Sequence, residues 1–280
     1  MSGSGSNARA VCEYCRSHAA AFAPVLILTD VRESAAAEIA RTYQLELAVM
    51  DMKEFYLEHG EKSTRLDSPR RMEIRDLWSD QAFELLQERN IELVLLAGFF
   101  SMTNLTGKIP CLNVHPGDLT VCSDDGKRIF AGLHYAPVEN AVCGGYPCLK
   151  SSVILAQPYS GNVKDDTDTG PVLGISVPVE IRRGSRSARE FEEIRLRRKK
   201  GEPVSDILRE LAAEHIERLK IYGDHCVFPA AADDFAAGRF AVDGTGKLHY
   251  SVNGSFIAVE TVQYSGTGAE PVLQKDGFLS

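Results

Sequence analysis

Short apolar runs alternate with amphipathic stretches through the first part of the chain. Residues 24–30, Pro-Val-Leu-Ile-Leu-Thr-Asp, form an apolar run of strand length bounded by Pro and Asp, which is typical of a strand buried in a parallel sheet. The elements expected here are strands over 24–30, 45–51 and 91–99 and helices over 8–21, 34–43 and 69–89. Their alternation predicts βαβ units with right-handed crossovers, and hence a Rossmann-like half over about residues 1–116.

The longest amphipathic stretch, 69–89, predicts a helix with one apolar face. The positions expected to face the core are Met72, Ile74, Leu77, Trp78, Phe83, Leu85 and Leu86.

The second part of the chain continues with shorter elements. We expect strands over 111–114, 151–157 and 172–179, and helices from about 130 to 142, over 182–200, over 205–222 and one ending near 238. Asn253-Gly254 lies between the apolar segments 247–250 and 255–259, which is a strong hairpin signal. We therefore expect an α/β domain over 1–240, with a catalytic half over 117–240, and a hairpin extension and tail over 241–280. The last dozen residues are expected to be loose.

Composition narrows the class of protein. The chain of 280 residues carries a net charge of −8 and has a pI near 5.5, which argues against general nucleic-acid binding. No apolar run approaches the roughly 18 residues that cross a bilayer, and the N-terminus lacks the apolar core of a signal peptide. The seven cysteines are an odd number, which favours reduced thiols and a cytoplasmic protein. Cys12 and Cys15 have CxxC spacing within a predicted helix, but no second pair with zinc-site spacing follows.

The N-terminal stretch Ser2-Gly3-Ser4-Gly5-Ser6-Asn7 leads directly into the first predicted helix. A turn of small residues that opens a helix presents free backbone N–H groups and can bind a phosphate. The alternative is a Gly/Ser tail, which composition alone favours. A phosphate loop normally follows a buried strand, and none precedes this one, so either a strand lies upstream or another segment fills the centre of the sheet. The loop also lacks the third glycine of a dinucleotide fingerprint.

Two polar motifs at strand ends point to chemistry at a carbonyl carbon. Asn113 and His115 are two residues apart in Asn-Val-His-Pro, so both project from one face of a strand at its C-terminal end. An amide and an imidazole together can stabilise an oxyanion and move a proton. Asp168 stands in Asp-Thr-Gly-Pro before a strand. By themselves, Asn113 and His115 can be turn formers, and Asp168 can form a simple Asx turn.

These motifs, in their order, resemble the folate-dependent formyltransferases, and most closely the branch that acts on glycinamide ribonucleotide. The matching segments run along nearly the whole chain and are Ser2–Asn7, Leu96-Ala97-Gly98-Phe99, Asn113-Val114-His115-Pro116, Gly132-Leu133-His134, Asp168-Thr169-Gly170-Pro171, 224–229 and Ala237-Gly238-Arg239. The resemblance implies a Rossmann-like formyltransferase fold, with a mostly parallel sheet flanked by helices. It implies transfer of a formyl group from 10-formyltetrahydrofolate to the amine of glycinamide ribonucleotide in purine synthesis. It implies no metal, nucleic-acid or membrane partner, and a monomer or homodimer.

The resemblance also assigns roles to residues. The catalytic residues it implies are Asn113, His115 and Asp168. Those it implies for the substrate are Ser4, Gly5, Ser6 and Asn7 for the phosphate, and Gly132 and Asp224 for the rest of the molecule. Those it implies for folate are Phe99, Phe100, Ser101, Met102, Thr103, Asp165 and Asp166.

The sequence departs from the family pattern at several positions. The stretch 100–103 changes side chains that line the folate pocket in the family, Asp224 replaces a Glu, and Ile154 stands where the family has a His. Three alternatives therefore stay open: an N-formyltransferase of an amino sugar nucleotide, a formyltetrahydrofolate hydrolase, and a binding protein that has the site without turnover.

Overall fold

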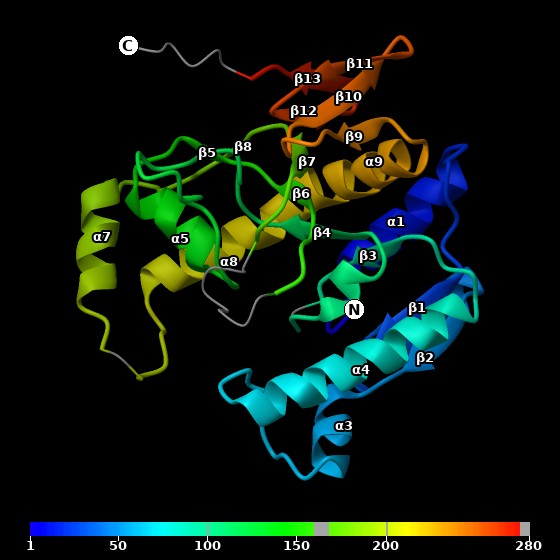
Figure 1. The fold of residues 1–280 in the computed structure, drawn as a ribbon. Helices are drawn as coiled ribbons and strands as arrows, with labels where there is room; N and C mark the ends of the chain where they lie inside the picture. The colour runs from blue at the N-terminus through cyan, green and yellow to red at the C-terminus, as the bar shows by residue number, and fades with distance from the viewer. Residues whose placement is uncertain (100, 160–167, 200, 275–280) are drawn as a thin grey trace. The chain divides into compact units, whose positions relative to one another are not determined.

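The computed structural model describes residues 1–99, 101–159, 168–199 and 201–274 (Figure 1). The chain divides into two compact units, which are described here one at a time. Unit 1 comprises Met1–Val114, Ile154–Pro171 and Ala232–Ala237, and unit 2 comprises His115–Val153, Val172–Ala231 and Gly238–Ser280.

Unit 1 contains most of the alternating elements that the apolar pattern predicts. They are α1 (Ser6–Ser17), β1 (Leu26–Thr29), α2 (Ala36–Tyr43), β2 (Glu46–Val49), α3 (Met52–Glu58), α4 (Pro69–Gln87), β3 (Val94–Leu96), the 3-10 turn η1 (Asn104–Gly107) and most of β4 (Cys111–His115). The short helix α3 was not expected from the sequence. It begins at Asp51, whose carboxylate accepts hydrogen bonds from the backbone N–H groups of Lys53 and Glu54, both at 3.0 Å.

Local capping determines where α4 begins, and packing determines which of its faces is buried. Its N-cap Ser68 accepts a hydrogen bond from the Arg71 N–H, and Pro69 occupies the first turn, where a missing N–H is harmless. The residues it buries are Ile74, Arg75, Trp78, Ser79, Ala82 and Leu86. The prediction for Leu77 was wrong, because its side chain is exposed. Ala82 belongs to the same apolar cluster as Trp78 and Leu86.

Unit 2 contains three helices packed together and several short strands. The elements are α5 (Ala136–Cys143), β5 (Cys148–Leu149), β6 (Ser152–Leu155, which continues into unit 1), β7 (Val172–Ser176), β8 (Val179–Glu180), α7 (Ala188–Leu196), α8 (Ile207–Leu219), the π-helical turn η2 (Lys220–Asp224), α9 (His225–Ala236), β9 (Phe240–Val242), β10 (Leu248–Val252), β11 (Ser255–Ala258), β12 (Thr261–Ser265) and β13 (Gly268–Val272). As the sequence predicts, β10 and β11 form a hairpin around Asn253 and Gly254. The last dozen residues, 269–280, were expected to be loose. This expectation was wrong for the residues up to Val272, because β13 pairs with β12, and residues 275–280 lie outside the described residues.

The strands form several sheets. The largest has the order β13-β12-β7-β6-β4-β3, and β1 with β2 forms a separate two-stranded sheet. The pairs β3–β4, β7–β12 and β1–β2 are parallel, and β12–β13 is antiparallel. The mixed α/β class with mostly parallel pairing is therefore confirmed. The expected continuous parallel sheet through the first half is not observed among the described residues, because β1 and β3 are not paired with each other.

Candidate active site

The Asn-x-His motif lies where the sequence predicts, at the C-terminal end of β4. Asn113 pairs with Leu96 of β3 across the parallel ladder. It is half-buried, whereas His115, two residues further on the same strand, is buried. Since side chains two apart on a strand share a face, both groups project at the strand end where α/β sheets place their ligands.

The imidazole of His115 is held by the loop that follows β4. Its Nε2 lies 2.7 Å from the backbone carbonyl oxygen of Phe130. A carbonyl can only accept a hydrogen bond, so Nε2 carries the proton in this arrangement.

Gly117 permits this approach of the loop. A Cβ atom at residue 117 would lie 2.8 Å from the Phe130 carbonyl oxygen and 3.0 Å from the His115 Nε2. Phe130 is itself buried and packs edge-on against Tyr146, with ring centroids 4.8 Å apart. The contact between the His115 imidazole and the Phe130 carbonyl thus depends on a glycine and on an aromatic contact.

A buried serine of β6, which sequence reasoning missed, ties down the same loop. The Ser152 hydroxyl donates to the Gly117 carbonyl at 2.7 Å and accepts from the Leu119 N–H at 2.9 Å. Next to it, the Asp118 carboxylate pairs with the Lys150 ammonium at 3.1 Å. No short-range pattern marks Ser152, because its partners lie more than 30 residues earlier.

The loop before α5 contains the predicted substrate residue Gly132. Gly132 has φ +129°, and His134 has φ +56°. Both residues thus have positive φ angles, which residues with side chains rarely adopt. Local backbone strain of this kind clusters at binding and catalytic sites. The role of Gly132 in substrate binding stays a prediction.

Asp168 lies in a tight turn before β7. Its φ is +57°, and Gly170 has φ +106°. A Cβ atom at residue 170 would lie 2.1 Å from the Leu155 carbonyl oxygen, so this turn requires glycine. On its other side, the end of β6 contacts β4, since the Ala156 N–H donates to the Cys111 carbonyl at 2.9 Å. Asn113 and Asp168 belong to unit 1 and His115 to unit 2, and the proximity of Asp168 to His115 stays a prediction. Asp165 and Asp166 lie outside the described residues.

Asp224 ends the π-helical turn η2 and is buried. Its carboxylate accepts a hydrogen bond from the Ser151 hydroxyl at 2.5 Å. Gly223 permits this contact, because a Cβ atom there would lie 2.4 Å from the same hydroxyl oxygen. Asp224 thus anchors the segment before β6, and its predicted contact with the substrate stays a prediction. π-helical turns of this kind are frequent at functional sites.

The small-residue loop Ser4 to Asn7 forms the N-terminus of α1. Gly5 is the N-cap, with φ 70°, and a Cβ atom there would lie 2.2 Å from the Ile39 Cδ1. No acidic residue lies in the first turn of the helix. The backbone N–H groups at the start of this helix therefore lie at the positive end of the helix dipole, which favours a bound anion.

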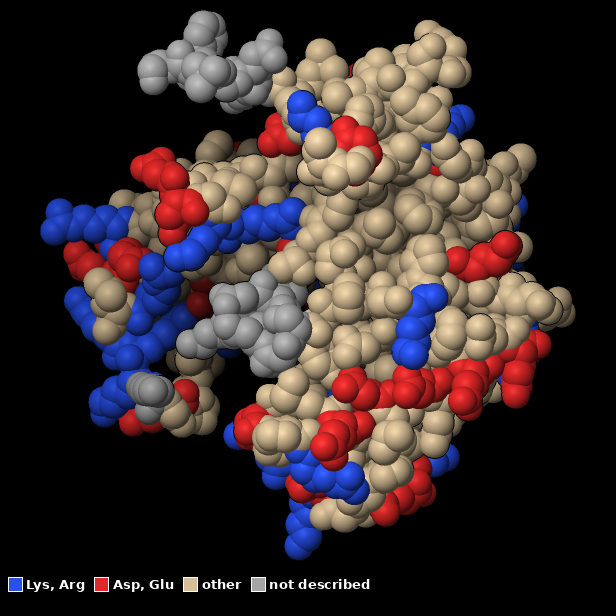
Figure 2. Space-filling view, viewed as in Figure 1, with Lys and Arg blue, Asp and Glu red and all other residues tan. Residues whose placement is uncertain are grey.

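Elsewhere in unit 1 the surface is acidic. Figure 2 shows acidic side chains in a row along α4. The exposed acids of this row are Glu73, Asp80, Glu84 and Glu88. Such a face repels polyanions, whereas the N-terminus of α1 favours an anion.

Of the residues predicted to line a folate pocket, some make contacts within the protein and others are only half-buried. Phe99 stacks on Trp78, with centroids 6.0 Å apart, and Thr103 is buried as the cap of η1. Ser101 and Met102 are half-buried, and the Met102 carbonyl accepts from the Arg75 guanidinium at 2.7 Å. Phe100 lies outside the described residues.

Two acidic residues near this wall were not predicted. The Asp30 carboxylate is buried and accepts from the Ser101 hydroxyl at 2.7 Å. Its second oxygen has no hydrogen-bond partner among the described residues. Asp76 accepts from the Asn104 amide and the Tyr159 hydroxyl, both at 2.7 Å. Burial, with this hydrogen bond, raises the pKa of Tyr159.

The described residues contain no group of three or more His, Cys, Asp or Glu side chains arranged to hold a metal ion. All seven cysteines have free thiols, and burial raises the pKa of Cys12 and Cys15, which makes them poor nucleophiles. In the part of the chain that the structure describes, no helix is both long enough and apolar enough to cross a membrane.

Comparison with known proteins supports the fold. No protein-family model and no curated sequence matches the chain. A phosphoribosylglycinamide formyltransferase from Coxiella burnetii matches with a TM-score of 0.61 over 95% of this chain and 96% of that chain, at 16% identity. One from Anaplasma phagocytophilum gives 0.57 over 90% and 92%, at 19% identity. A formyltetrahydrofolate deformylase from Pseudomonas syringae pv. tomato gives 0.58 over 88% of this chain and 62% of that chain, at 11% identity. The chain therefore has the Rossmann-like fold of these proteins, as the resemblance predicts.

Proposed function

We propose that this protein transfers a formyl group from 10-formyltetrahydrofolate to a primary amine. The observation that carries the proposal is the pair Asn113 and His115 at the end of β4, with the imidazole held by the Phe130 carbonyl at 2.7 Å. The similar structures supply the context, since they are named as formyltransferases and a formyltetrahydrofolate deformylase.

The chemistry follows from the groups at the strand end. Attack of an amine on the formyl carbon forms a tetrahedral intermediate that bears an oxyanion. The Asn113 side-chain amide donates a hydrogen bond to this oxyanion, and protonated His115 donates a second one from Nδ1. The reaction needs no covalent enzyme intermediate, and no metal ion is part of the proposal.

Asp168 completes the proposed mechanism. We assign Asp168 to the water that carries a proton from the attacking amine to the leaving nitrogen of the folate. In this role the carboxylate needs to be within one water of the substrate amine. A carboxylate within hydrogen-bond reach of His115 would also fix the orientation of the imidazole.

The acceptor that we propose is glycinamide ribonucleotide. The N-terminus of α1, from Ser4 to Asn7, would bind its phosphate through backbone N–H groups. Gly132 and Asp224 would contact the rest of the substrate. Phe99 to Thr103 and the segment with Asp165 and Asp166 would contact the folate.

Replacing His115 with Ala tests the proposal. We expect kcat for formyl transfer to fall by roughly 10²–10⁴-fold, the range for a lost acid–base group. His18→Ala is the matched control, because His18 is exposed at the end of α1 and its loss should leave kcat unchanged. The assay follows consumption of 10-formyltetrahydrofolate with and without glycinamide ribonucleotide.

The outcomes distinguish the competing functions. Amine-dependent consumption supports formyl transfer, whereas consumption without any amine indicates a hydrolase. Activity with an amino sugar nucleotide alone would reassign the acceptor. No turnover, and no folate binding by calorimetry at millimolar ligand, would overturn the enzymatic proposal.

A further inference from the structure

A short strand of unit 2 has an edge that no described strand covers. Strands β9, β10 and β11 form a three-stranded sheet in the order β11-β10-β9, and β10 and β11 are drawn in orange in Figure 1. Strand β11, Ser255–Ala258, pairs with β10 alone among the described residues. Its central residues are apolar and exposed, Phe256 to 51% and Ile257 to 36%. An exposed apolar edge of this kind is a template for another strand.

The composition of β11 differs from that of two other edge strands. Strand β13, at the end of the six-stranded sheet, contains Glu270 and Pro271. Strand β2, which pairs with β1 alone among the described strands, begins with Glu46, whose carboxylate lies 2.6 Å from the Arg89 guanidinium. Charged residues and prolines on an edge hinder pairing with another chain. In contrast, residues 248–259 include no Asp, Glu, Lys or Arg, so β11 lacks both kinds of protection.

The ladder between β10 and β11 shows which backbone groups face the open edge. The Val259 N–H donates to the Leu248 carbonyl at 2.9 Å, so these two residues form a hydrogen-bonded pair. Such pairs alternate along an antiparallel ladder, which makes Ile257 the next residue of β11 that bonds to β10. The N–H and C=O groups of Phe256 and Ala258 therefore point away from β10, towards the open edge.

These outward groups are complementary to those of a second copy of the same strand. In an antiparallel pair related by a two-fold axis through Ile257, Phe256 lies opposite Ala258 of the second copy. The N–H and C=O groups of both residues then bond to their counterparts, and none is left over. An axis through Phe256 would instead pair Ala258 with Gly254, which lies in the turn with φ +82° and is not extended.

Side chains and charge favour the same arrangement. Residues opposite each other in a ladder share a face of the sheet, so the large Phe256 would cover the small Ala258 of the second copy. Its neighbour within the chain is also small, because Phe256 lies opposite Ser251 of β10. Each copy carries a net charge of −8, and pairing through β11 brings no charged side chains of the two strands together.

We propose that two copies of this chain associate through β11 and form one continuous antiparallel sheet with the strand order β9-β10-β11-β11-β10-β9. The contact is small, since each copy contributes one four-residue strand, whereas stable interfaces use about 20–30 residues a side. The dimer is therefore weak, with a dissociation constant in the micromolar range, and it forms or dissociates with protein concentration.

Sedimentation equilibrium of the full chain, from micromolar to several hundred micromolar protein, tests the proposal. The average mass should rise with concentration from 30.7 kDa towards twice that value. Phe256→Lys should weaken association by roughly tenfold or more, because a lysine on an edge disfavours pairing. Val242→Lys is the matched control: it lies on β9 at the far edge of the same sheet, is 46% exposed, and should leave association unchanged. Added salt should not weaken the dimer, whereas it would weaken one held by charged faces.

Cysteine cross-linking tests the position of the axis. Ile257→Cys, in a chain whose exposed Cys122 and Cys226 are replaced by Ser, should form an intermolecular disulfide under mild oxidation. The two residues on the axis form a non-hydrogen-bonded pair with Cα atoms about 4.5 Å apart, which a disulfide can bridge. Phe256→Cys in the same background is the control and should cross-link far less, because the two sulfurs would be out of register.

Amide hydrogen exchange gives a readout that needs no substitution. Exchange of the Phe256 and Ala258 N–H groups should slow as protein concentration rises, whereas that of Ile257, already bonded to β10, should not change.

Several results would overturn the proposal. They are a monomer at every concentration, equal effects of Phe256→Lys and Val242→Lys on association, and cross-linking of Phe256→Cys in preference to Ile257→Cys. A chain that stays monomeric but protects β11 on adding an apolar peptide would show that the edge binds a different partner. These measurements do not involve formyl transfer, so they stand or fall separately from the proposed function.

Discussion

The helices α5, α7 and α8 of unit 2 and the strands β1 and β3 of unit 1 bury their surfaces in opposite ways. The three helices enclose an apolar core that includes Val138, Phe191 and Leu208. The strands, in contrast, face a cavity with apolar side chains and unpaired edges. The helical core also includes Leu149, Val179 and Ile181 from outside the helices, whereas among the described residues β1 pairs with β2 alone and β3 with β4 alone.

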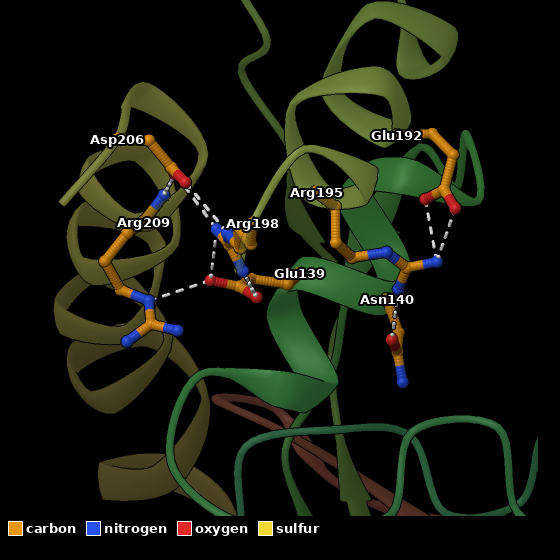
Figure 3. A network of polar contacts seen from close by, with 7 residues as sticks. All are labelled: Glu139, Asn140, Glu192, Arg195, Arg198, Asp206 and Arg209. Carbon is orange, nitrogen blue, oxygen red and sulfur yellow. Dashed lines mark hydrogen bonds and ion pairs between the residues drawn. The ribbon is translucent and has the colours of Figure 1, made fainter. Parts of the chain in front are cut away.

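The helices also satisfy their buried charges internally. Figure 3 shows Arg198 between the carboxylates of Glu139 and Asp206, with Arg209 on the far side of Glu139. Arg198 lies 2.6 Å from Glu139 and 2.8 Å from Asp206, and Arg209 lies 2.8 Å from Glu139. The Glu139 side chain is only 7% exposed, so its charge depends on these guanidinium groups.

The charged segment 182–200, in which basic residues predominate, thus has a structural role at its C-terminal end. Arg183 at the other end donates to the carbonyls of Ala141 and Val142, both at 3.1 Å, and to that of Tyr146. These carbonyls belong to the end of α5 and the turn after it. The last carbonyls of a helix have no partner within the helix. The charge-rich segment therefore belongs to a well-packed part of the protein. In contrast, β3, which lies in the most apolar run of the chain, pairs with a described strand on only one of its two edges.

The largest expected effect contrasts two leucines. Leu208→Ala, in the closed helical core, should cost about 3–4 kcal/mol of unfolding free energy. Leu86→Ala should cost about 2 kcal/mol, because Leu86 faces the cavity and already lacks neighbours on that side. Chemical denaturation measures both values. Equal costs would contradict the comparison.

Arg198→Ala should cost nearly as much, about 3 kcal/mol, because it leaves the buried Glu139 with one cation in place of two. Arg189→Ala, in the helix α7 that precedes Arg198, is the matched control, since its side chain is 89% exposed, and its loss should change stability by less than about 0.5 kcal/mol. Equilibrium denaturation at low and high salt separates the two. A cost at Arg198 as small as that at Arg189 would show that the network is not stabilising.

The amino group of Met1 gives unit 1 a pH-dependent contribution to its stability. Its pKa is lowered from 8.0 to about 6 by burial, against the opposing attraction of Asp30. The unfolded chain therefore binds more protons between pH 6 and 8, and stability should rise with pH across this window, by at most about 2.7 kcal/mol for two units.

The control for this pH effect is the same chain with the Met1 amino group acetylated, in which this nitrogen is an amide nitrogen that does not titrate. Buried His215 and His225, whose pKa values burial also lowers, act in both proteins and cancel in the difference. Unfolding free energies measured from pH 5.5 to 8.5 should differ in slope between the two proteins only from pH 6 to 8. Parallel profiles would show that the amine is solvated.

The smallest effect concerns the start of α7. Ser187 accepts from the Glu190 N–H, and the Glu190 carboxylate accepts in return from the Ser187 N–H, which forms a capping box. Ser187→Ala should cost about 1 kcal/mol, and Ser185→Ala, two residues before the cap and exposed, should cost almost nothing. Thermal melts of the two variants give the difference. No difference would mean that packing alone orders α7.

Local sequence determined much of this protein. Ser68-Pro69 marks the start of α4, Asn253-Gly254 marks the β10–β11 hairpin, and the glycine-containing loop before α1 forms a helix N-terminus. Asn113 and His115 were placed at a strand end by their spacing alone. These features depend on capping, turn geometry and periodicity, which act over a few residues.

Only the tertiary structure decided which groups meet. The Phe130 carbonyl that holds His115, the Ser152 hydroxyl that ties the loop and the Ser151 partner of Asp224 all come from segments 15 to 73 residues away. The same holds for the open edge of β3. Its apolar run predicts a buried strand, but periodicity reports how apolar a segment is and not whether a neighbour is there to cover it, because pairing depends on contacts that close across the whole fold.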